Sequence, residues 1–597
     1  MSSQNQHFRL FWLGTLGSVA TALLLFLPSI RYGLVWDDAT VLEQLRSFRQ
    51  LKDFLVVPDS VPKFYYRPVV FASFWLEQQL SGANAATFHR TNIFLHSLNT
   101  GLVAVALWRV FALDPRICVA SSWLFATHPV HTEAVAWIAG RSDLLTTLFF
   151  LLALVAYAQP TRAIRILAAV AFALALGAKE PAIAAVPLFG LFDLSRRRKP
   201  DWLFYGIAFL ILATYLALRQ INLGTPLGGW ERGSGLGEKT VESLRALGWY
   251  SLHALIPGLV TPYVPRMPAV SGLELAGGLV LLAGAWVVWR HPRTNLSLLV
   301  ALFLCTLAPA VAILWRVSAS TVLADRYVYL PSLAAVALLS TFLARWTLQR
   351  SAIFYLSISG LAAFFFAWKT ARYLPTWRDN LAFWSAAAAV APDVSTPQRE
   401  IGLALLERRQ LAEAEPFFAR AVALARLPEE QAMARSNLAS LYRQRGDYAR
   451  ALEELEAAVR IAAHPGLYHN LGLTAMMAAE AAQSAGSGRD VLVLVQRAKS
   501  ALQKALAYEA HPQAARYREL WAPAKTHALL GQVLFSLHDY SGSRFHLERA
   551  LALDPNGPTA AITRLYLGKL PPEAPAAPAA PASPAEPPAS KTGSGTP

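Results

Sequence analysis

Two adjacent aspartates, Asp37 and Asp38, follow a long apolar stretch and a tryptophan in the segment "RYGLVWDDATVLEQL" at 31–45. Ionised groups this close to a membrane segment cost free energy, so we expect them to have a function. A carboxylate can act as a general base and take the proton from a hydroxyl group, which is a poor nucleophile until then. Since adjacent side chains point in different directions on a helix or strand, only one of the two should face a substrate. We favour Asp38 as this base, with Asp37 orienting it or the loop.

Polar side chains of both charge signs recur in short segments between later apolar runs. A single His or Arg near a helix end usually caps the helix or reaches the membrane interface. Glu133 with Arg141, or Asp143 with Lys179, could also be structural ion pairs. The histidines form no compact ligand group on one element, so a metal site is not favoured. The recurrence itself indicates a polar site, whose members are Tyr65, Tyr66, Arg67, His89, Asn92, His96, His128, His131, Glu133, Arg141, Asp143, Lys179, Glu180, Asp325, Arg326 and Tyr327.

The elements that carry these residues are predicted to be membrane helices. The chain has 597 residues, 55% of them hydrophobic and only 15% charged, and its mean hydropathy is +0.35. Soluble domains carry about a quarter charged residues, so this composition indicates a polytopic membrane protein. Because a span needs roughly 20 apolar residues, we expect about 11 spans, near 10–30, 92–112, 117–135, 143–159, 163–178, 181–195, 201–220, 273–290, 295–313, 328–345 and 351–369.

The basic residues orient these spans. With the N terminus inside, basic residues fall in the inner loops, as the positive-inside rule requires; these loops contain Arg116, Arg162 and Arg165, 195–201, 290–293 and 345–350. The formal charge of +16 is explained in this way and does not indicate a nucleic-acid partner. An odd number of spans places the C-terminal part outside, with Asp37 and Asp38. The segment 244–262 contains prolines and is interpreted as interfacial or half-inserted; if it spans, the C-terminal part is inside.

A recurring pattern of small and large apolar residues fills 392–555. Gly402, Ala414 and Phe418 in one unit correspond to Gly531, Ser543 and Leu547 in another. Spacing of this kind, with a period of about 34 residues, is the tetratricopeptide signature. Such arrays form a concave groove that often binds a polypeptide, although a plain spacer is the alternative. We divide the chain into a membrane domain at 1–372, a repeat domain at 373–566 and a disordered Pro/Ala-rich tail at 567–597.

Several motifs together resemble the membrane O-mannosyltransferase-like family with C-terminal tetratricopeptide repeats, a branch of the C superfamily of glycosyltransferases. The similarity covers essentially 10–555, and the long block at 128–145 is its most specific part. Two departures are Asp325, where Glu is expected, and an insertion in the third repeat. The motifs are "WDD" (36–38), "YRP" (66–68), "FHRTNIFLH" (88–96), "HPVHTEAVAWIAGRSDLL" (128–145), "KEP" (179–181), "DRYVYLPS" (325–332) and "TWRDNLAFW" (376–384).

The resemblance implies an all-α glycosyltransferase domain of the C type followed by an α-solenoid. It also implies transfer of a sugar, mannose in that family, from a polyprenyl phosphate to a protein Ser or Thr at the outer face. A carboxylate of the first outer loop would be the base, and one direct displacement would invert the anomeric carbon. The leaving lipid phosphate needs cations, for which the candidates are Arg67, Arg141, Lys179 and Arg326. The remaining substrate-binding candidates are His128, His131, Glu133, Asp143, Glu180 and Tyr327.

The chemistry needs no nucleotide or other cofactor beyond the lipid-phosphate sugar, and it leaves a divalent metal open. The segment 221–270, with Trp230, Trp249 and Tyr263, suits a lid at the interface or a simple connector. The partners would be the lipid-linked donor, an acceptor polypeptide in the repeat groove and membrane lipids. Composition favours a bacterial inner membrane with periplasmic repeats, with the endoplasmic reticulum and lumenal repeats as the alternative. Rival functions are a glycan ligase or polymerase, a membrane-anchored repeat scaffold without catalysis, and a transporter, which should show paired halves.

Overall fold

The structure is a computed structural model that describes residues 3–50, 52–58, 65–82, 84–224, 235–315, 321–511 and 521–572, without the side chains of 3–7, 46 and 489. Over these residues the chain is helical, without a named strand; an isolated bridge joins Val264 and Leu323. The predicted all-α class is thereby confirmed. The chain divides into two compact units, Met1–Arg426 and Leu427–Pro597. Trp230 and the tail from 573 lie outside the described residues.

The first unit contains the apolar helices and the first helical repeat. Its helices are α1 (Ser3–Phe26), α2 (Asp38–Gln44), α3 (Lys52–Leu55), α4 (Pro68–Ser81), α5 (Ala85–Arg109), α6 (Pro115–Thr127), α7 (His131–Ala136), α8 (Arg141–Ala158), α9 (Arg162–Ala178), α10 (Ala185–Ser195), α11 (Trp202–Leu223), α12 (Leu236–Leu255), α13 (Leu273–Arg290), α14 (Asn295–Ala312), α15 (Tyr329–Thr347), α16 (Ala352–Tyr373), α17 (Asn380–Val390), α18 (Ser395–Glu407) and α19 (Leu411–Leu424).

Seven helical segments among the described residues are long and apolar enough to cross a membrane. They are Phe8–Arg31, Ile138–Ala158, Trp202–Leu223, Leu273–Arg290, Asn295–Trp315, Asp325–Thr347 and Ala352–Trp377.

Four other predicted spans also fall on helices, α5, α6, α9 and α10. Helices α6, α9 and α10 have 13, 17 and 11 residues, shorter than the roughly 20 that a straight span needs. Helix α5 has 25 residues but buries polar side chains such as Asn92 and Asn99 along its length. The predicted number of 11 spans is therefore not confirmed.

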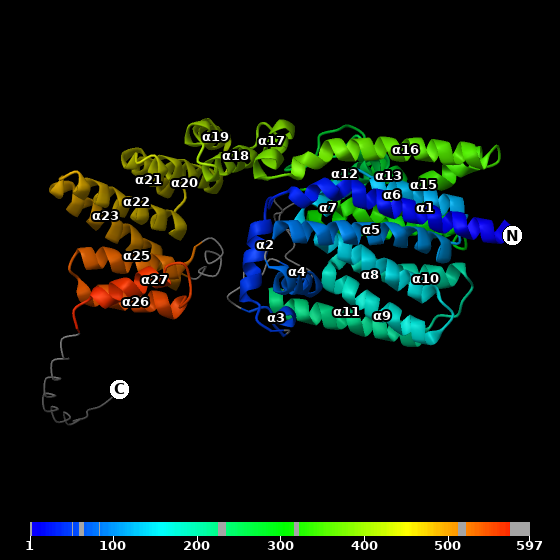
Figure 1. Cartoon of the computed structure of the whole chain (residues 1–597), viewed down its shortest axis with the longest axis horizontal. Helices are drawn as coiled ribbons and strands as arrows, with labels where there is room; N and C mark the ends of the chain where they lie inside the picture. Colours follow the sequence, from blue (N-terminus) through cyan, green and yellow to red (C-terminus); the bar gives the residue numbers. More distant parts are fainter. Residues whose placement is uncertain are drawn as a thin grey trace, which may run out of the picture. The chain divides into compact units, whose positions relative to one another are not determined.

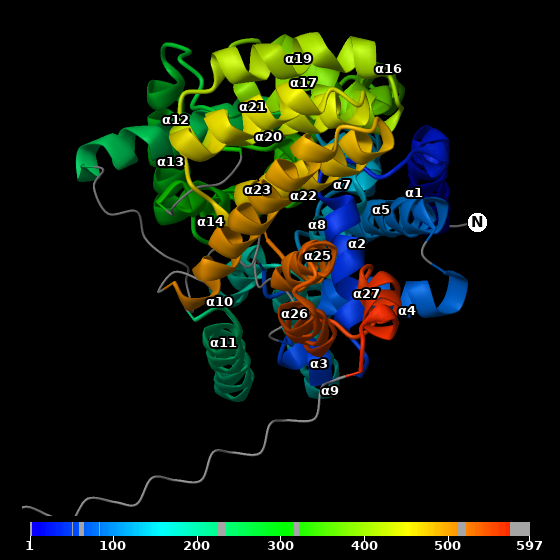
Figure 2. The same cartoon turned by 90° about the vertical axis from the view of Figure 1, so that its left-hand side faces the viewer.

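Helix α6 packs against α1, α5, α15 and α16 (Figure 1; Figure 2 shows the same chain turned by 90°). Small residues allow the close approach of α1, because a Cβ at Gly14 would lie 2.6 Å from Val119 on α6. The hydroxyls of Ser18 and Ser122 then hydrogen-bond across the same interface at 2.7 Å. Small and hydroxyl-bearing residues of this kind are typical of helix contacts in membranes.

The segment 244–262 becomes the last part of α12 and the loop after it. It is absent from the seven candidate spans. A Cβ at Gly248 would overlap the carbonyl oxygen of Leu273, and one at Gly277 would overlap that of Leu244. The two glycines therefore bring the backbones of α12 and α13 into direct contact. Trp249 and Tyr263, which we placed in a lid, are both buried.

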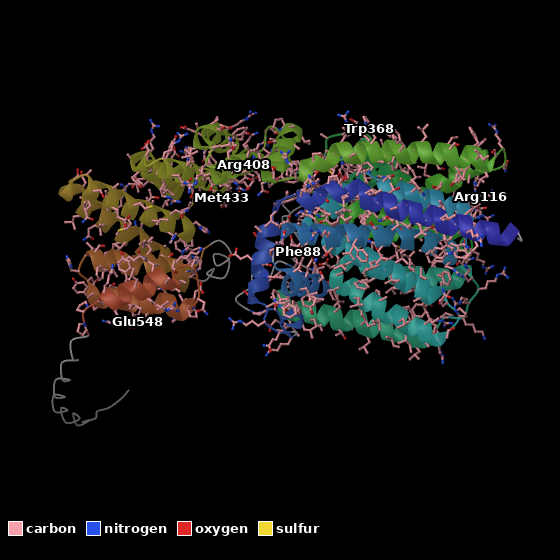
Figure 3. All side chains as sticks on the ribbon, in the orientation of Figure 1. Phe88, Arg116, Trp368, Arg408, Met433 and Glu548 are labelled. Atoms are coloured by element: carbon pink, nitrogen blue, oxygen red, sulfur yellow. The ribbon has the colours of Figure 1, made fainter. Side chains whose placement is uncertain are left out.

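The first interhelical loop and the segment after the last apolar helix meet at one end of the first unit. The amide of Gly33 donates to the carbonyl of Arg378 (2.9 Å), and the amide of Trp36 donates to Oδ1 of Asn380 (2.8 Å). The segments that follow the first and the last apolar helix therefore lie at the same end of the first unit. Arg116, a predicted inner-loop residue, lies at the other end, near the N terminus (Figure 3).

The repeats fold as antiparallel helix pairs. The second unit contains α20 (Pro428–Gln444), α21 (Tyr448–Ile461), α22 (Pro465–Ser484), α23 (Gly488–Ala507), α25 (Pro523–Ser536), α26 (Tyr540–Leu553) and α27 (Ala560–Lys569). The predicted small residues lie where paired helices touch: a Cβ at Gly402 or Gly531 would lie 2.6 Å from Phe418 or Leu547, respectively. The insertion in the third repeat lengthens both of its helices, α22 and α23, to 20 residues each.

Candidate active site

Asp38 has a structural role in the first loop, where its carboxylate binds two backbone amides. It is 1% exposed, and it begins α2. Its Oδ2 accepts the amide of Val35 and its Oδ1 accepts the amide of Ala139, both at 2.9 Å. Burial raises the pKa of Asp38 to about 8, although these amides oppose the shift. Because both oxygens bind backbone amides, Asp38 holds the loop against the turn before α8 and presents no free oxygen to a substrate.

Asp37 differs from Asp38 in its hydrogen bonding. It is half-buried, and its buried Oδ1 has no hydrogen-bond partner at normal geometry, like the indole nitrogen of Trp137 close to it. Burial raises the pKa of Asp37 above its usual range, and the charges of Arg326 and Arg67 only partly offset this. A carboxylate with a free oxygen beside two cations can accept a proton. The geometry therefore favours Asp37 over Asp38, the reverse of the preference drawn from the sequence.

Of the cations around Asp37, Arg326 lowers the pKa of its carboxyl group most. Its amide donates to Oε2 of Glu133 (2.9 Å), and its guanidinium forms an ion pair with the same carboxylate. The guanidinium also lies 5.0 Å from the ring centroids of both Trp137 and Tyr327 and 5.8 Å from that of Trp36. Glu133 on α7 and three aromatic rings thus fix the position of one positive charge.

Lys179 and Asp143 form a buried ion pair in the same cluster. The Lys179 ammonium donates to both carboxylate oxygens of Asp143 at 2.7 Å and lies 4.8 Å from the centroid of Tyr327. Burial lowers the pKa of Lys179 to about 8; Asp143 opposes this shift, and the charges of Arg67 and Arg326 add to it. The predicted alternative of an Asp143–Lys179 ion pair is therefore present.

Arg67 and Glu180 complete the cluster. Burial by itself would raise the pKa of Glu180, but the charges of Arg67 and Arg219 lower it to about 2. Glu180 is paired with Arg219 of α11. Arg67 forms no ion pair among the described residues; its guanidinium lies 4.4 Å from the ring of Tyr65, and its buried Nε has no partner. Arg67 therefore offers the positive charge that is least neutralised within the cluster.

The backbone conformation of Trp36 determines the directions in which the next two side chains, Asp37 and Asp38, point. Its φ of +59° is unusual for a residue with a side chain and costs about 1–2 kcal/mol. Its indole is stacked between Trp137 (5.6 Å) and Phe383 (5.4 Å), and its amide donates to Asn380. These contacts hold the left-handed turn in which the chain sends Asp38 inward and Asp37 toward Arg326. The motif at 376–384 contains both Phe383 and Asn380, but the sequence alone could not show that these residues contact Trp36.

Arg141 does not join the cluster. Its side chain is fully buried, with an ion pair to Glu77 on α4 (2.6 Å) and hydrogen bonds to Oδ1 of Asn92 and the carbonyl of Phe88 on α5 (3.0 Å each). The guanidinium therefore connects three helices, and the geometry does not support its expected role in binding phosphate. Its predicted pairing with Glu133 is not formed, since Glu133 binds Arg326.

The two predicted histidines of the long motif lie in the helix core. His128 is hydrogen-bonded to the carbonyl of Ala254 (3.2 Å) and His131 to the hydroxyl of Ser332 (2.8 Å). Both are fully buried. Within the described ranges, no three His, Cys, Asp or Glu side chains gather as a metal site would require.

Comparison with known proteins finds partial similarities. The tetratricopeptide repeat family matches residues 393–464. The chain is 41% identical over 99 residues to the protein O-mannosyl-transferase TMTC1 of Mus musculus, covering 17% of this chain and 10% of that protein. It is 33% identical over 198 residues to Tmtc1 of Drosophila melanogaster, also a protein O-mannosyl-transferase, covering 30% of this chain and 23% of that protein.

The chain is related to these transferases in part. It matches less than a quarter of the length of each, so their activity is carried over only as a proposal. Among solved structures, the crystal structure of BtubC (BKLC) from P. vanneervenii matches with a TM-score of 0.23 and 18% identity, over 32% of this chain and 78% of that one. This last similarity is too low to support an argument.

Proposed function

We propose that the protein is a membrane O-mannosyltransferase of the glycosyltransferase C type, which moves mannose from a polyprenyl phosphate to a Ser or Thr hydroxyl of a polypeptide. The observation that carries the proposal is the juxtaposition of Asp37, whose Oδ1 lies beside the Trp137 indole and accepts no backbone amide, and the cations Arg326 and Arg67. The partial similarity to protein O-mannosyl-transferases supports the same activity.

In the proposed reaction, Asp37 accepts the proton of the acceptor hydroxyl. The acceptor oxygen attacks the anomeric carbon of the sugar while the bond from this carbon to the phosphate oxygen breaks, so the configuration is inverted. The lipid phosphate leaves with the bonding electron pair. Arg67 and Arg326 stabilise the negative charge that develops on it, with Lys179 as the cation behind them, in a site shielded by aromatic rings.

Asp38 and Glu133 act on this reaction through other groups. Asp38 fixes the loop by binding two amides, and Glu133 fixes Arg326. Of the other predicted substrate-binding residues, Asp143 holds Lys179, Glu180 binds Arg219, and Tyr327 faces two cations. None of these steps needs a further cofactor, and a divalent metal remains open.

An apolar hollow suits the lipid chain of the donor. It has a volume of about 500 Å³ and is lined by α12, α13 and α14, with Leu247, Leu281, Leu304, Val311 and Trp315 among its residues. Two of these helices, α13 and α14, belong to candidate membrane spans. An isoprenoid chain bound there would lie against spanning helices and remove apolar surface from water.

The tetratricopeptide repeats would hold the acceptor polypeptide on the side where the reaction occurs. We place that side in the periplasm of a bacterium, with the lumen of the endoplasmic reticulum as the alternative. Concave repeat arrays commonly bind extended peptides, and the segment that connects α16 to the first repeat is hydrogen-bonded to Trp36 through Asn380.

The test is a transfer assay with the purified full-length protein, polyprenyl-phosphate mannose and a Ser-containing peptide. Asp37→Asn should lower transfer by about 10²–10⁴-fold, the usual contribution of a general base, without changing thermal stability. Asp38→Asn should instead lower stability by about 1–3 kcal/mol, because one buried amide loses its acceptor.

The outcomes separate the roles. Full transfer by Asp37→Asn would rule out Asp37 as the base. Unchanged stability of Asp38→Asn would rule out the structural role of Asp38. Absence of transfer by the wild-type protein with any lipid-linked sugar would favour the repeat scaffold instead.

A further inference from the structure

A second hollow lies beside the proposed reaction centre. It has a volume of about 510 Å³. One wall is the end of α12 with the loop to α13, and the other is the end of α17 with the residues before α18; the lining includes Trp249, Tyr263, Met267, Val270, Val390 and Val394. All of these residues belong to the first unit.

The hollow is close to Asp37 through a continuous layer of rings. Tyr263, in its wall, has ring contacts with Trp36 (6.4 Å) and Trp384 (5.6 Å). Trp36 immediately precedes Asp37 in the chain. A molecule in the hollow would therefore lie one aromatic layer from the carboxylate, a separation that an extended peptide bridges in a few residues at about 3.3 Å per residue.

The charges of the hollow do not suit a lipid phosphate. Its one lining cation, Arg266, forms an ion pair with Asp393 at 2.7 Å, and the nearby Arg426 binds the same carboxylate at 3.2 Å. A lipid phosphate bound here would have to compete with Asp393 for Arg266, whereas Arg67 at the proposed reaction centre forms no ion pair among the described residues. The cations of the proposed reaction centre, Arg67 and Arg326, do not line this hollow.

Its polar atoms also distinguish it from the hollow at α14. His253 and Thr261 line it; Nε2 of His253 lies 3.9 Å from Oδ1 of Asp325, whereas Oγ1 of Thr261 has no hydrogen-bond partner. A hydrocarbon chain would leave the Thr261 hydroxyl unsatisfied, which costs free energy. A polypeptide combines apolar side chains with N–H and hydroxyl groups, so it matches both parts of the wall.

We infer that this hollow binds an apolar side chain of the acceptor polypeptide a few residues from the Ser or Thr that receives the sugar. The inference rests on the proposed function and adds a sequence preference to it, separate from any binding by the repeats. An apolar pocket of this type discriminates a large side chain from a small one by about tenfold or more. The protein should accordingly prefer peptides with Phe or Leu near the acceptor residue to matched peptides with Ala.

The kinetic test compares two short synthetic peptides, each with one Ser, that differ by Phe or Ala at a neighbouring position. The wild-type protein should show a kcat/KM at least about tenfold higher for the Phe peptide. Val390→Trp and Val270→Trp fill the hollow from its two walls, and both positions are exposed at 56% and 58%. Each variant should reduce the preference to about one.

Val241→Trp is the matched control, since Val241 is an exposed valine on α12 outside the hollow. It should keep the wild-type preference. Equal use of both peptides by the wild-type protein, or an unchanged preference in both filled variants, would overturn the inference. A ratio of two peptides is insensitive to the fraction of folded enzyme, so partial misfolding of one variant does not obscure the result.

A second measurement does not require transfer. The same peptide with benzoylphenylalanine in place of Phe should, on irradiation, label residues in 259–273 or 390–394 of the wild-type protein, and much less in Val390→Trp. Labelling there without sugar transfer would contradict the proposed function and keep the hollow as a peptide site. Transfer without labelling there would keep the proposed function and contradict the hollow as a peptide site.

Discussion

The two ends of α8 carry polar clusters of opposite design. Asp143 near its start belongs to the cluster around Asp37, and Tyr157 near its end belongs to a second network with Asp193 and Tyr205. The two residues are 14 positions apart, or about 21 Å along a helix. The same helix thus passes through two polar regions whose hydrogen bonding can be compared directly.

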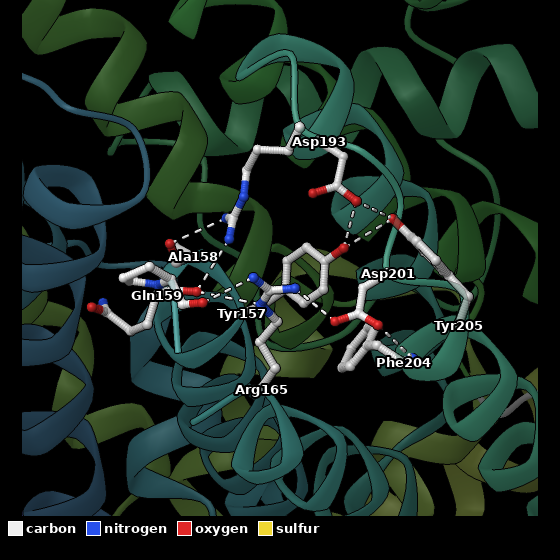
Figure 4. A network of polar contacts seen from close by, with 10 residues as sticks. Tyr157, Ala158, Gln159, Arg165, Asp193, Asp201, Phe204 and Tyr205 are labelled. Atoms are coloured by element: carbon white, nitrogen blue, oxygen red, sulfur yellow. Dashed lines mark hydrogen bonds and ion pairs between the residues drawn. The ribbon is translucent and has the colours of Figure 1, made fainter. Parts of the chain in front are cut away.

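In the network at the end of α8, the polar groups satisfy one another (Figure 4). Tyr157 and Tyr205 donate to Oδ2 of Asp193 at 2.6 and 2.9 Å, and Arg165 donates to Asp201 at 2.6 Å. None of the buried side-chain polar atoms of these five residues lacks a hydrogen-bond partner. Such a network links α8, α9, α10 and α11 and leaves no group free for a substrate.

The cluster at the start of α8 is incomplete. Oδ1 of Asp37, Nε of Arg67 and the indole nitrogen of Trp137 have no partner at normal geometry. Unsatisfied buried polar groups cost about 1–3 kcal/mol each, so a protein that needed only stability would close this cluster as it closes the other. The contrast supports the proposed function, in which the cluster at the start of α8 meets the substrate and the network at its end contributes to stability.

Among the variants that test this contrast, the largest expected effect is at Arg326. Arg326→Gln should lower transfer by about 10²–10³-fold, the usual loss when a group that stabilises developing charge is removed. It should also raise the pKa of Asp37 further, since Arg326 opposes the upward shift that burial causes. Because the base works only when ionised, the acid limb of the kcat/KM profile should move to higher pH. The measurement is that profile for the wild-type and variant proteins.

Two controls accompany this variant. Arg326→Lys keeps the charge and should leave the acid limb near its wild-type position. Since Arg326→Gln leaves Glu133 buried without its partner, the double variant with Glu133→Gln should recover stability and not transfer. Recovery of transfer in the double variant would show that Arg326 has only a structural role.

Asp193 should show the complementary result. Asp193→Asn weakens two charge-assisted hydrogen bonds from Tyr157 and Tyr205, so we expect a loss of about 1–3 kcal/mol in stability and a melting temperature lower by a few degrees. Transfer per folded molecule should stay within about twofold of wild type. If Asp193→Asn lowers kcat as strongly as Asp37→Asn, the polar groups at the two ends of α8 do not have separate roles.

A smaller effect is expected at Asn380, a positioning residue. Asn380→Leu removes the acceptor for the amide of Trp36 and should lower kcat by about tenfold, equivalent to about 1.4 kcal/mol, through misplacement of Asp37. Asn380→Asp keeps a carboxyl oxygen in the same place and should restore most of kcat. Equal losses in the two variants would point to a general disturbance of the segment at 376–384.

Local patterns in the sequence predict much of this architecture. Apolar runs mark the long helices, and the spacing of Gly402 and Phe418 predicts the contact between α18 and α19 that the structure contains. The possible ion pair of Asp143 with Lys179 could also be named, because both residues flank apolar runs at the same predicted level. These features depend on residues within one helix, one helical hairpin or one turn.

The choice between Asp37 and Asp38 could not be predicted in this way. It depends on the amide of Ala139, which is 101 residues from Asp38, and on Asn380, which is 344 residues from Trp36. The role of Arg141 similarly depends on Glu77 and Asn92 from two other helices. Contacts between distant segments leave no periodic trace in a single sequence, so composition and spacing could find the polar residues but not their partners.

The smallest expected effect tests how completely the second network is closed. Tyr205 donates to Asp193 at 2.9 Å and Tyr157 donates to the same oxygen at 2.6 Å, while the two hydroxyl oxygens lie 3.2 Å apart. Tyr205→Phe removes one donor and keeps the ring, and Asp193 retains Tyr157. We therefore expect a loss of only about 0.5–1.5 kcal/mol, the net value of one hydrogen bond, measured by thermal unfolding in detergent. Tyr157→Phe removes the shorter bond and should cost more than Tyr205→Phe. If the order is reversed, or if either variant alters the pH profile of transfer, then the network at the end of α8 is coupled to the reaction centre and the two ends do not have separate roles.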